Sequence, residues 1–186
     1  IERNPTIRSL APLSTVLSPP TASTVAGRPV ANLSFAVDHW LAPGSVRQFH
    51  VTNVLIHLVA GFLLLGVVRR TLDCDPIRPR VGLDPAWPAA ALAAIWLVHP
   101  LQTESVTYVV QRAESLMGLF VLLTLYCAIR AHGPGRRWWA VASVAACAAG
   151  MATKEVTVVA PLLVLLWDWL FGRRPPESAD TAPRWT

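Results

Sequence analysis

The residues best suited to chemistry lie in one polar segment, His99 to Ser115, between two long apolar stretches. On a helix, where about 3.6 residues make a turn, one face of this segment is polar and the opposite face is apolar. Carboxylates can act as bases or charge partners, and arginine neutralises phosphate groups. The polar face consists of Glu104, Thr107, Tyr108, Gln111, Glu114 and Ser115, with Arg112 at its flank.

The pattern predicts one continuous helix from about Gln102 to Arg130. Pro100 biases His99 away from helix, so a preceding helix should end near Val98. Beyond Gly118 the segment is apolar all round, which is typical of a helix that enters a bilayer from its surface. At about 1.5 Å per residue the helix would exceed the roughly 30 Å hydrocarbon core, so its first turns should stand in the interface.

The composition indicates an all-α, polytopic integral membrane protein. Of the 186 residues, 53% are hydrophobic and only 15% are charged, which is too apolar for an ordinary soluble domain. We predict an extracytoplasmic loop with a short interfacial helix over 1–49, a transmembrane domain over 50–171, and a cytoplasmic, disordered tail over 172–186. Within it we predict about five transmembrane helices, at about 50–69, 86–98, 102–130, 138–153 and 156–171, of which 86–98 is short for a bilayer.

The positive charges indicate how the chain is oriented. The net charge is +5, but the arginines stand mostly at the ends of apolar runs, which argues for membrane orientation and against nucleic-acid binding. With residues 1–49 outside, the outer loops within the transmembrane domain hold only Arg112 and Lys154. The inner side then collects Arg69, Arg70, Arg78, Arg80, Arg130, Arg136, Arg137, Arg173 and Arg174.

Three polar groups should therefore meet on the outer side. Cations beside carboxylates at a membrane surface suit a lipid-phosphate substrate. Lys154 is the only lysine in the chain. We predict no metal site, because the three cysteines lack metal-ligand spacing and hydrogen bonds between helices are favoured over metal binding for His50 and His57. The groups are His50, Asn53 and His57; His99, Glu104 and Arg112; and Lys154 with Glu155.

Each group also has a purely structural interpretation. Glu104 and Arg112 could form a structural pair. His50 and His57 could make hydrogen bonds between helices. The dipeptide Lys154-Glu155 could be a solvated turn. Asp168, inside the last predicted span, would cost roughly 2.5 to 3.5 kcal/mol at mid-bilayer, so we expect it near the inner surface.

An ordered set of short motifs resembles the transmembrane and tetratricopeptide-repeat (TMTC) proteins and their bacterial relatives. The resemblance covers about residues 1–171. It implies a partial GT-C glycosyltransferase fold in a bacterial inner membrane and a soluble tetratricopeptide domain after the membrane region. The motifs are Asn4-Pro5-Thr6-Ile7-Arg8, Arg28-Pro29, Leu33-Ser34-Phe35-Ala36-Val37-Asp38, Phe49-His50-Val51-Thr52-Asn53 with His57, His99-Pro100 with Glu104, Arg112-Ala113-Glu114, Lys154-Glu155 and Trp167-Asp168.

The resemblance further implies transfer of a sugar from a polyprenyl-phosphate donor to protein hydroxyls on the outer face. The donor is dolichyl-phosphate mannose in the eukaryotic members, and membrane lipid and an acceptor protein are the other partners. The family's acidic catalytic pair would precede Ile1, so we interpret the chain as an internal fragment in which Glu104 has a supporting catalytic role. The substrate-binding residues implied are Arg112, Lys154, His99, Glu114, Glu155, Arg28 and His50.

A second function class stays open. The chain could instead be a non-catalytic membrane anchor or assembly scaffold of a tetratricopeptide-repeat protein, in which the polar groups only pack helices. An acidic pair just before Asn4 would favour the enzyme, and its absence would favour the scaffold.

Overall fold

The computed structural model describes residues 4–21, 23–75, 77–133 and 135–172, and all regular structure in these residues is helical. The all-α prediction is therefore confirmed, while residues 173–186 of the predicted tail lie outside the described ranges. The α-helices are α1 (Leu13–Val16), α2 (Pro29–Leu41), α3 (Val46–Leu72), α4 (Arg78–Val81), α5 (Ala86–Val98), α6 (Thr103–Thr107), α7 (Arg112–Arg130), α8 (Arg136–Met151) and α9 (Val159–Trp167). Five short helices complete the described structure: η1 (Pro5–Ile7), η2 (Pro100–Gln102), η3 (Val109–Gln111), η4 (Glu155–Val158) and the π-helical η5 (Asp168–Gly172).

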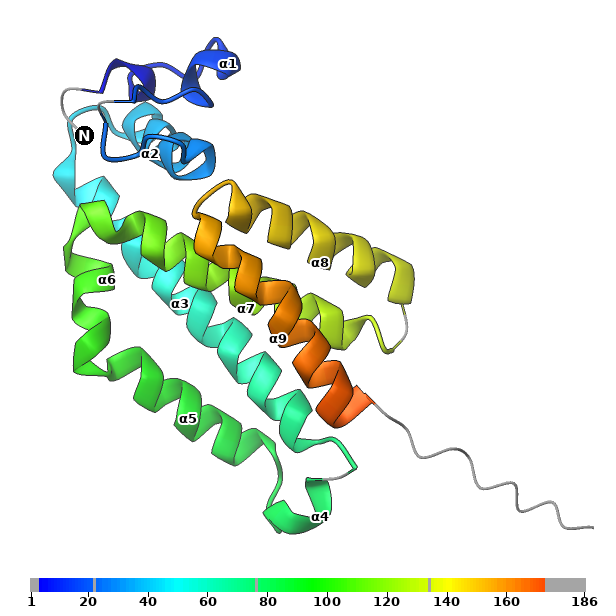
Figure 1. Cartoon of the computed structure of the whole chain (residues 1–186). Coiled ribbons are helices and arrows are strands. Elements are labelled where there is room, and N and C mark those ends of the chain that lie inside the picture. The colour runs from blue at the N-terminus through cyan, green and yellow to red at the C-terminus, as the bar shows by residue number, and fades with distance from the viewer. Residues whose placement is uncertain (1–3, 22, 76, 134, 173–186) are drawn as a thin grey trace, which may run out of the picture.

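Helices α3 and α7 form the centre of the bundle. They pack against each other, α5 packs on α3, and α8 and α9 pack on α7 (Figure 1). Glycines permit two of these contacts, because a Cβ on Gly61 would overlap Leu97 of α5 and one on Gly66 would overlap Tyr126 of α7. Small residues at helix interfaces let backbones approach closely in membrane bundles.

Three helical segments are long and apolar enough to cross a membrane: Val46–Leu72, Val109–Arg130 and Glu155–Gly172. The chain is thus an integral membrane protein. The five predicted spans coincide with helical segments, with an interruption at Tyr108 in 102–130, but α5 has 13 residues and α8 has 16. At 1.5 Å per residue these two reach only about 20 and 24 Å, short of a core roughly 30 Å thick.

The bundle has two chemically different ends. At the α2 end, which residues 4–21 and 23–44 cover, Val30 N donates to Ala152 O at 3.3 Å and ties α2 to the loop after α8. The opposite, arginine-rich end carries Arg69, Arg70, Arg130, Arg136 and Arg137. There Trp167 Nε1 donates to Thr71 Oγ1 at 2.9 Å, and Asp168 lies 3.3 Å from His132. Asp168 is half exposed at this end, as expected for a carboxylate near a membrane surface.

The prediction of a continuous helix from Gln102 to Arg130 is wrong. The chain leaves the helix at Tyr108, whose backbone is extended, passes through η3 and starts α7 at Arg112. Three valines and a threonine in this stretch lower its helix propensity. The break turns the Tyr108 carbonyl toward Asn53 Nδ2, 3.5 Å away on α3. The polar residues of this segment therefore do not share one helix face.

The N-terminal segment packs more tightly than a surface loop would. The interfacial helix was predicted to begin at Ala31, and in the structure it begins at Pro29 as α2. Its residue Asn32 is fully buried. The Asn32 side chain accepts from Asn4 Nδ2 and donates to Thr6 Oγ1 and to Val16 O, which joins η1, α1 and α2. The apolar core of this layer continues into α3 and α7 through Ile7, Val16, Val25, Ala31, Phe35, Ala36, Ile56, Ala113 and Leu116.

Gly150→Ala should lower the stability of the fold by about 1 to 3 kcal/mol, the usual effect of overpacking a buried site. A Cβ at Gly150 would lie 2.5 Å from Thr157 Cγ2 and 2.9 Å from Phe120 Cβ. Thr157 is fully buried and its β-branched side chain has few rotamers, so it cannot move far enough to make room for the new methyl group. Thermal unfolding of the full-length gene product in detergent, followed by tryptophan fluorescence, measures the loss.

Gly118→Ala is the matched control, since a Cβ at Gly118 of α7 meets nothing within 4 Å. Replacing a helical glycine by alanine without overlap should leave the fold equally stable, or stabilise it by up to about 1 kcal/mol. If the Gly150→Ala and Gly118→Ala proteins unfolded at the same temperature, tight packing at the end of α8 would be contradicted.

Candidate functional site

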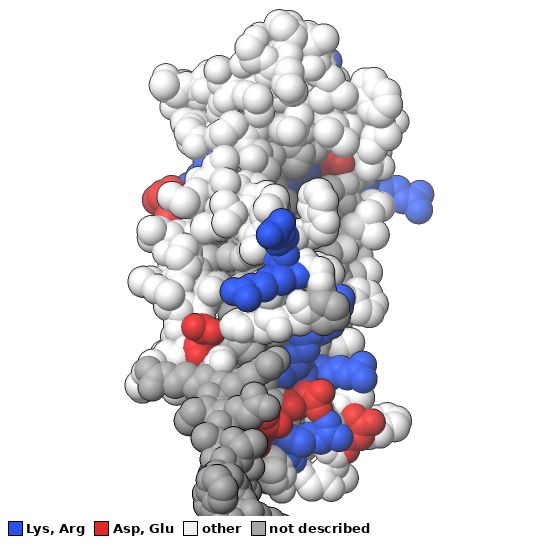
Figure 2. All heavy atoms as spheres, turned by 90° about the vertical axis from the view of Figure 1, so that its right-hand side faces the viewer, with Lys and Arg blue, Asp and Glu red and all other residues white. Residues whose placement is uncertain are grey.

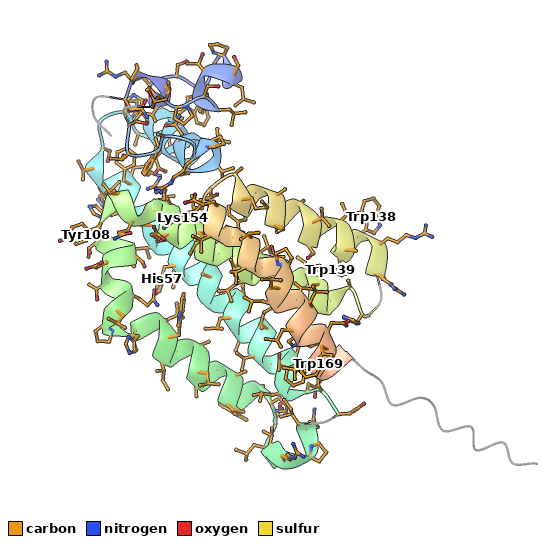
Figure 3. The ribbon with its side chains drawn as sticks, in the orientation of Figure 1. His57, Tyr108, Trp138, Trp139, Lys154 and Trp169 are labelled. Atoms are coloured by element: carbon orange, nitrogen blue, oxygen red, sulfur yellow. The ribbon has the colours of Figure 1, made fainter. Side chains whose placement is uncertain are left out.

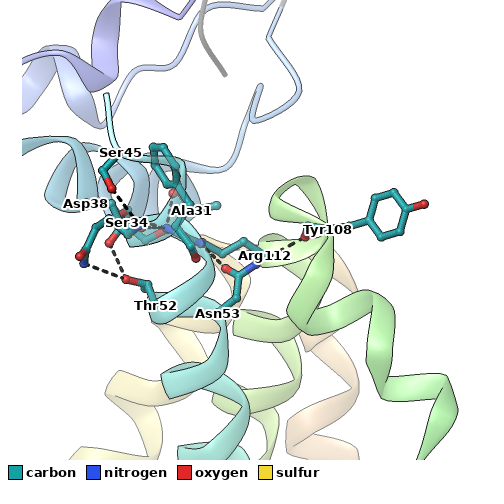
Figure 4. A network of polar contacts seen from close by, with 10 residues as sticks. Ala31, Ser34, Asp38, Ser45, Thr52, Asn53, Tyr108 and Arg112 are labelled. Carbon is teal, nitrogen blue, oxygen red and sulfur yellow. Dashed lines mark hydrogen bonds and ion pairs between the residues drawn. The ribbon is translucent and has the colours of Figure 1, made fainter. Parts of the chain in front are cut away.

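Arg112 lies at the centre of a buried polar network at the α2 end (Figure 4). Its guanidinium donates to the Asp38 carboxylate of α2 at 2.5 Å, to Asn53 Oδ1 of α3 at 2.8 Å and to Phe49 O at 2.7 Å. Thr52 donates to the other Asp38 oxygen. Arg112 also stacks on the Phe35 ring, with 4.4 Å between its Cζ and the ring centroid.

This network corrects the expectation that Arg112 flanks an exposed polar face. The side chains of Arg112 and Asp38 are 0% and 2% exposed, so the guanidinium is closed off from the surface. Its donors are directed at acceptors of the protein, which leaves no direction from which a substrate phosphate could approach. A charge buried this deeply is retained only when it is paired and hydrogen-bonded, as it is here. Arg112 therefore joins α2, α3 and α7, and its partner is Asp38 rather than Glu104.

A small cavity lies below this network, between α3, α5, α6 and α7. Its volume is about 100 Å³, well below the roughly 300 to 1,000 Å³ of sites that enclose a whole ligand. It has room for no more than one small group. The lining combines polar and apolar side chains: His57, Ala60, Trp96, Gln102, Ser105, Glu114, Ser115, Gly118 and Leu119.

Glu114 on the cavity wall forms an ion pair with Lys154. Lys154 comes from the loop between α8 and η4, and its backbone N–H donates to Gly150 O at 2.8 Å, which ends α8 and directs the side chain toward α7. The Lys154 and Glu114 side chains are 19% and 40% exposed, so both can be reached from the surface. Figure 3 shows Lys154 at the same end of the bundle as Tyr108. Lys154 and Glu114 are the two predicted site residues that the structure brings together.

The other predicted residues lie outside this cavity. Glu104 on α6, His99 and Glu155 are exposed, and Arg28 is half-buried at the start of α2. His99 Nδ1 accepts from Leu101 N at 3.2 Å, which stabilises the turn after α5. Roles for these residues in substrate binding remain predictions, and the structure does not gather them at one point.

Both histidines of α3 contact backbone carbonyls of neighbouring helices. His50 Nδ1 is 3.4 Å from Val106 O, and His57 Nε2 is 3.0 Å from Leu97 O. This geometry favours the interhelical hydrogen bonds considered for them. His57 also stacks on Trp96, with ring centroids 4.9 Å apart, and faces the cavity.

The described residues hold no group of three or more histidine, cysteine or acidic side chains that could bind a metal ion. Outside the spans, Cys74 donates from Sγ to Arg70 O at 3.2 Å. Burial, with a smaller contribution from the Asp75 charge, raises the pKa of the Cys74 thiol. The thiol therefore stays protonated at neutral pH and is a poor nucleophile or ligand.

Sequence reasoning missed most of the cavity lining. Gln102 and Ser105 were not singled out, and they meet Ser115 only because the chain turns at Tyr108, which leaves Ser115 Oγ 3.3 Å from Ser105 O. Trp96 lies in an apolar run of the sequence, where a tryptophan does not stand out as a candidate site residue. Asp38 was detectable in principle, since a carboxylate among the apolar residues of α2 requires a cationic partner.

Comparison with known proteins decides the family. Residues 80–178 match the family model described as dolichyl-phosphate-mannose-protein mannosyltransferase, a match over more than half of the chain. The chain belongs to this family. The match includes α5, α6, α7 and both residues of the Lys154–Glu114 pair.

Individual relatives point the same way. Over 152 residues, 78% of the chain, it is 32% identical to the protein O-mannosyl-transferase Tmtc2 of Drosophila melanogaster. It is 33% identical over 157 residues, 77% of the chain, to the protein O-mannosyl-transferase TMTC4 of Homo sapiens. The chain spans only about 15% and 21% of the length of these two relatives. No solved structure gives a significant match.

Proposed function

We propose that the chain is part of a membrane glycosyltransferase of the GT-C type that transfers a sugar, mannose by analogy with its relatives, from a polyprenyl-phosphate donor to protein hydroxyls. Family membership supports the transferase class, and the relatives are named protein O-mannosyl-transferases. The observation that carries the proposal is the Lys154–Glu114 pair beside a small cavity of mixed polar and apolar lining at one end of the helical bundle.

The donor chemistry explains why a cation is needed there. As the acceptor oxygen attacks the sugar carbon, the carbon–oxygen bond to phosphate breaks, its electron pair stays on the phosphate, and the acceptor proton passes to a base. A fixed cation stabilises the charge that develops on the phosphate. Lys154 supplies that cation, and Glu114 orients it. Among the residues of this chain, Glu104 is the carboxylate that would support that base.

The position of the pair agrees with a lipid-borne donor. Lys154 follows α8 and Glu114 lies in the first turn of α7, so both stand where helices end at a membrane surface. A phosphate held at that depth keeps its polyprenyl chain in the bilayer. We propose that the α2 end faces outward and the arginine-rich end faces the cytoplasm of a bacterial inner membrane, because arginine concentrates in cytoplasmic loops.

The test is a transfer assay with the full-length gene product in membranes. Radiolabelled polyprenyl-phosphate mannose and a membrane-free acceptor-protein fraction should give label in protein that is released by mild base, as expected of a sugar linked to a hydroxyl. A nucleotide sugar in place of the lipid donor should give none. Absence of transfer from any polyprenyl-phosphate sugar would favour the scaffold instead.

A further inference from the structure

A second cavity lies at the arginine-rich end, far from the Lys154–Glu114 pair. Its volume is about 540 Å³, and Ala131, His132, Arg136, Ala140 and Gly172 line it. It is therefore bounded by the α7–α8 turn, the first turns of α8 and the end of η5. In Figure 3, Trp138 and Lys154 lie at opposite ends of α8, which separates this cavity from the proposed donor site.

The cavity presents positive charge. Arg136 is exposed, and none of the described residues accepts a hydrogen bond from its guanidinium. His132 is half exposed, and its Nε2 lies 3.3 Å from Asp168 Oδ1, which leaves Nδ1 without a partner among the described residues. Asp168 is the carboxylate near this site, and its contact orients the imidazole. Figure 2 shows the charged side chains of this face, basic ones interspersed with acidic ones, mostly below a largely uncharged upper part.

The depth of the cavity in the membrane follows from its neighbours. Helix α7 ends at Arg130 and α8 begins at Arg136, so the turn between them lies at a membrane surface. Trp138 and Trp169 are 81% and 59% exposed on the same end of the bundle (Figure 3). Exposed tryptophans are enriched at the level of lipid headgroups. The cavity thus opens at headgroup depth rather than into bulk water.

We propose that this cavity binds the phosphate group of an anionic membrane lipid. A guanidinium binds phosphate oxygens with two parallel hydrogen bonds, and His132 can add a third from Nδ1 once protonated. Arg130 is held against the Trp139 ring, 4.4 Å from its centroid, and adds positive charge beside the site. The apolar walls supplied by Ala131 and Ala140 leave room for the glycerol end of the lipid. The proposal does not depend on the transferase activity.

Arg136→Gln should lower the ratio of phosphatidylglycerol to phosphatidylcholine that the protein retains by about fivefold, the effect of losing one basic contact with an anionic headgroup. The full-length gene product is purified in detergent, incubated with an equal mixture of the two lipids and analysed by native mass spectrometry. Arg136→Lys keeps the charge but cannot form the two parallel hydrogen bonds of a guanidinium, so it should show an intermediate lipid ratio. His132→Asn should lower the ratio less than Arg136→Gln does.

Arg80→Gln is the matched control, because Arg80 is exposed on α4 at the same end and lies outside the cavity. It should keep the parent ratio. The proposal would be overturned if Arg80→Gln lowered the lipid ratio as much as Arg136→Gln does. It would also be overturned if Arg136→Gln kept the parent lipid ratio while unfolding at the parent temperature. Inorganic phosphate at the lipid concentration should not displace the lipid. If it does, the cavity binds a soluble phosphate ion and the lipid assignment is wrong.

Discussion

Arg112→Met should destabilise the fold by about 3 to 5 kcal/mol, the usual effect of removing one partner of a buried ion pair. The substitution would leave the Asp38 carboxylate 2% exposed and without its cation. It would also remove the donors to Asn53 and to the Phe49 carbonyl, so α2, α3 and α7 would lose their common contact. Thermal unfolding of the full-length gene product in detergent measures the effect.

Companion variants make the result specific. Asp38→Asn should destabilise nearly as much, because Arg112 then remains buried with a neutral partner. The double variant Arg112→Met with Asp38→Leu should lose less stability than the two single variants lose together, since no uncompensated charge remains. Arg112→Lys should not restore stability, because one ammonium cannot reach all the acceptors that the guanidinium does.

Arg47→Gln is the control for general charge loss, since Arg47 is exposed at the start of α3. It should change stability by no more than about 0.5 kcal/mol. An Arg112→Met protein that unfolds like the parent yet loses sugar transfer would return Arg112 to the substrate site and disprove the structural role argued from its burial.

Lys154→Gln should lower kcat/KM for sugar transfer by about 100- to 1,000-fold, the effect of removing one group that stabilises developing charge. The fold should survive, because the Lys154 side chain is 19% exposed and its partner Glu114 is 40% exposed. Lys154→Arg keeps a cation at the site and should recover part of the rate. Glu114→Gln should reduce transfer less than Lys154→Gln, since the cation remains but loses its orientation. Rates come from the polyprenyl-phosphate mannose assay over a range of donor concentrations.

The exposed carboxylates provide the comparison. Glu155 is next to Lys154 in sequence but lies outside the cavity, and Glu104 stands on α6. If Glu155→Gln lowered kcat/KM for sugar transfer as much as Lys154→Gln does, the site would lie on the open surface rather than at the cavity. Transfer at the parent rate with Lys154→Gln would mean that the Lys154–Glu114 pair is structural.

The sequence alone determined the helical membrane class and the positions of the long helices. Apolar runs bounded by arginine, proline and glycine are local features, and the predicted spans coincide with helical segments, except for the break at Tyr108 within 102–130. Three of these segments are long and apolar enough to cross a membrane. The helix end before His99 was also readable, because the effect of Pro100 on its neighbour is local.

Tertiary structure alone decided which polar groups meet. The periodicity of residues 104–115 favours one amphipathic helix, but the contact of Asn53 with the Tyr108 carbonyl accompanies a break. The pairing of Arg112 with Asp38, 74 residues away, and of Lys154 with Glu114, 40 residues away, depends on how α2, α7 and α8 pack. Charge attraction acts between whichever groups the fold brings within a few ångströms, and sequence spacing does not encode that distance.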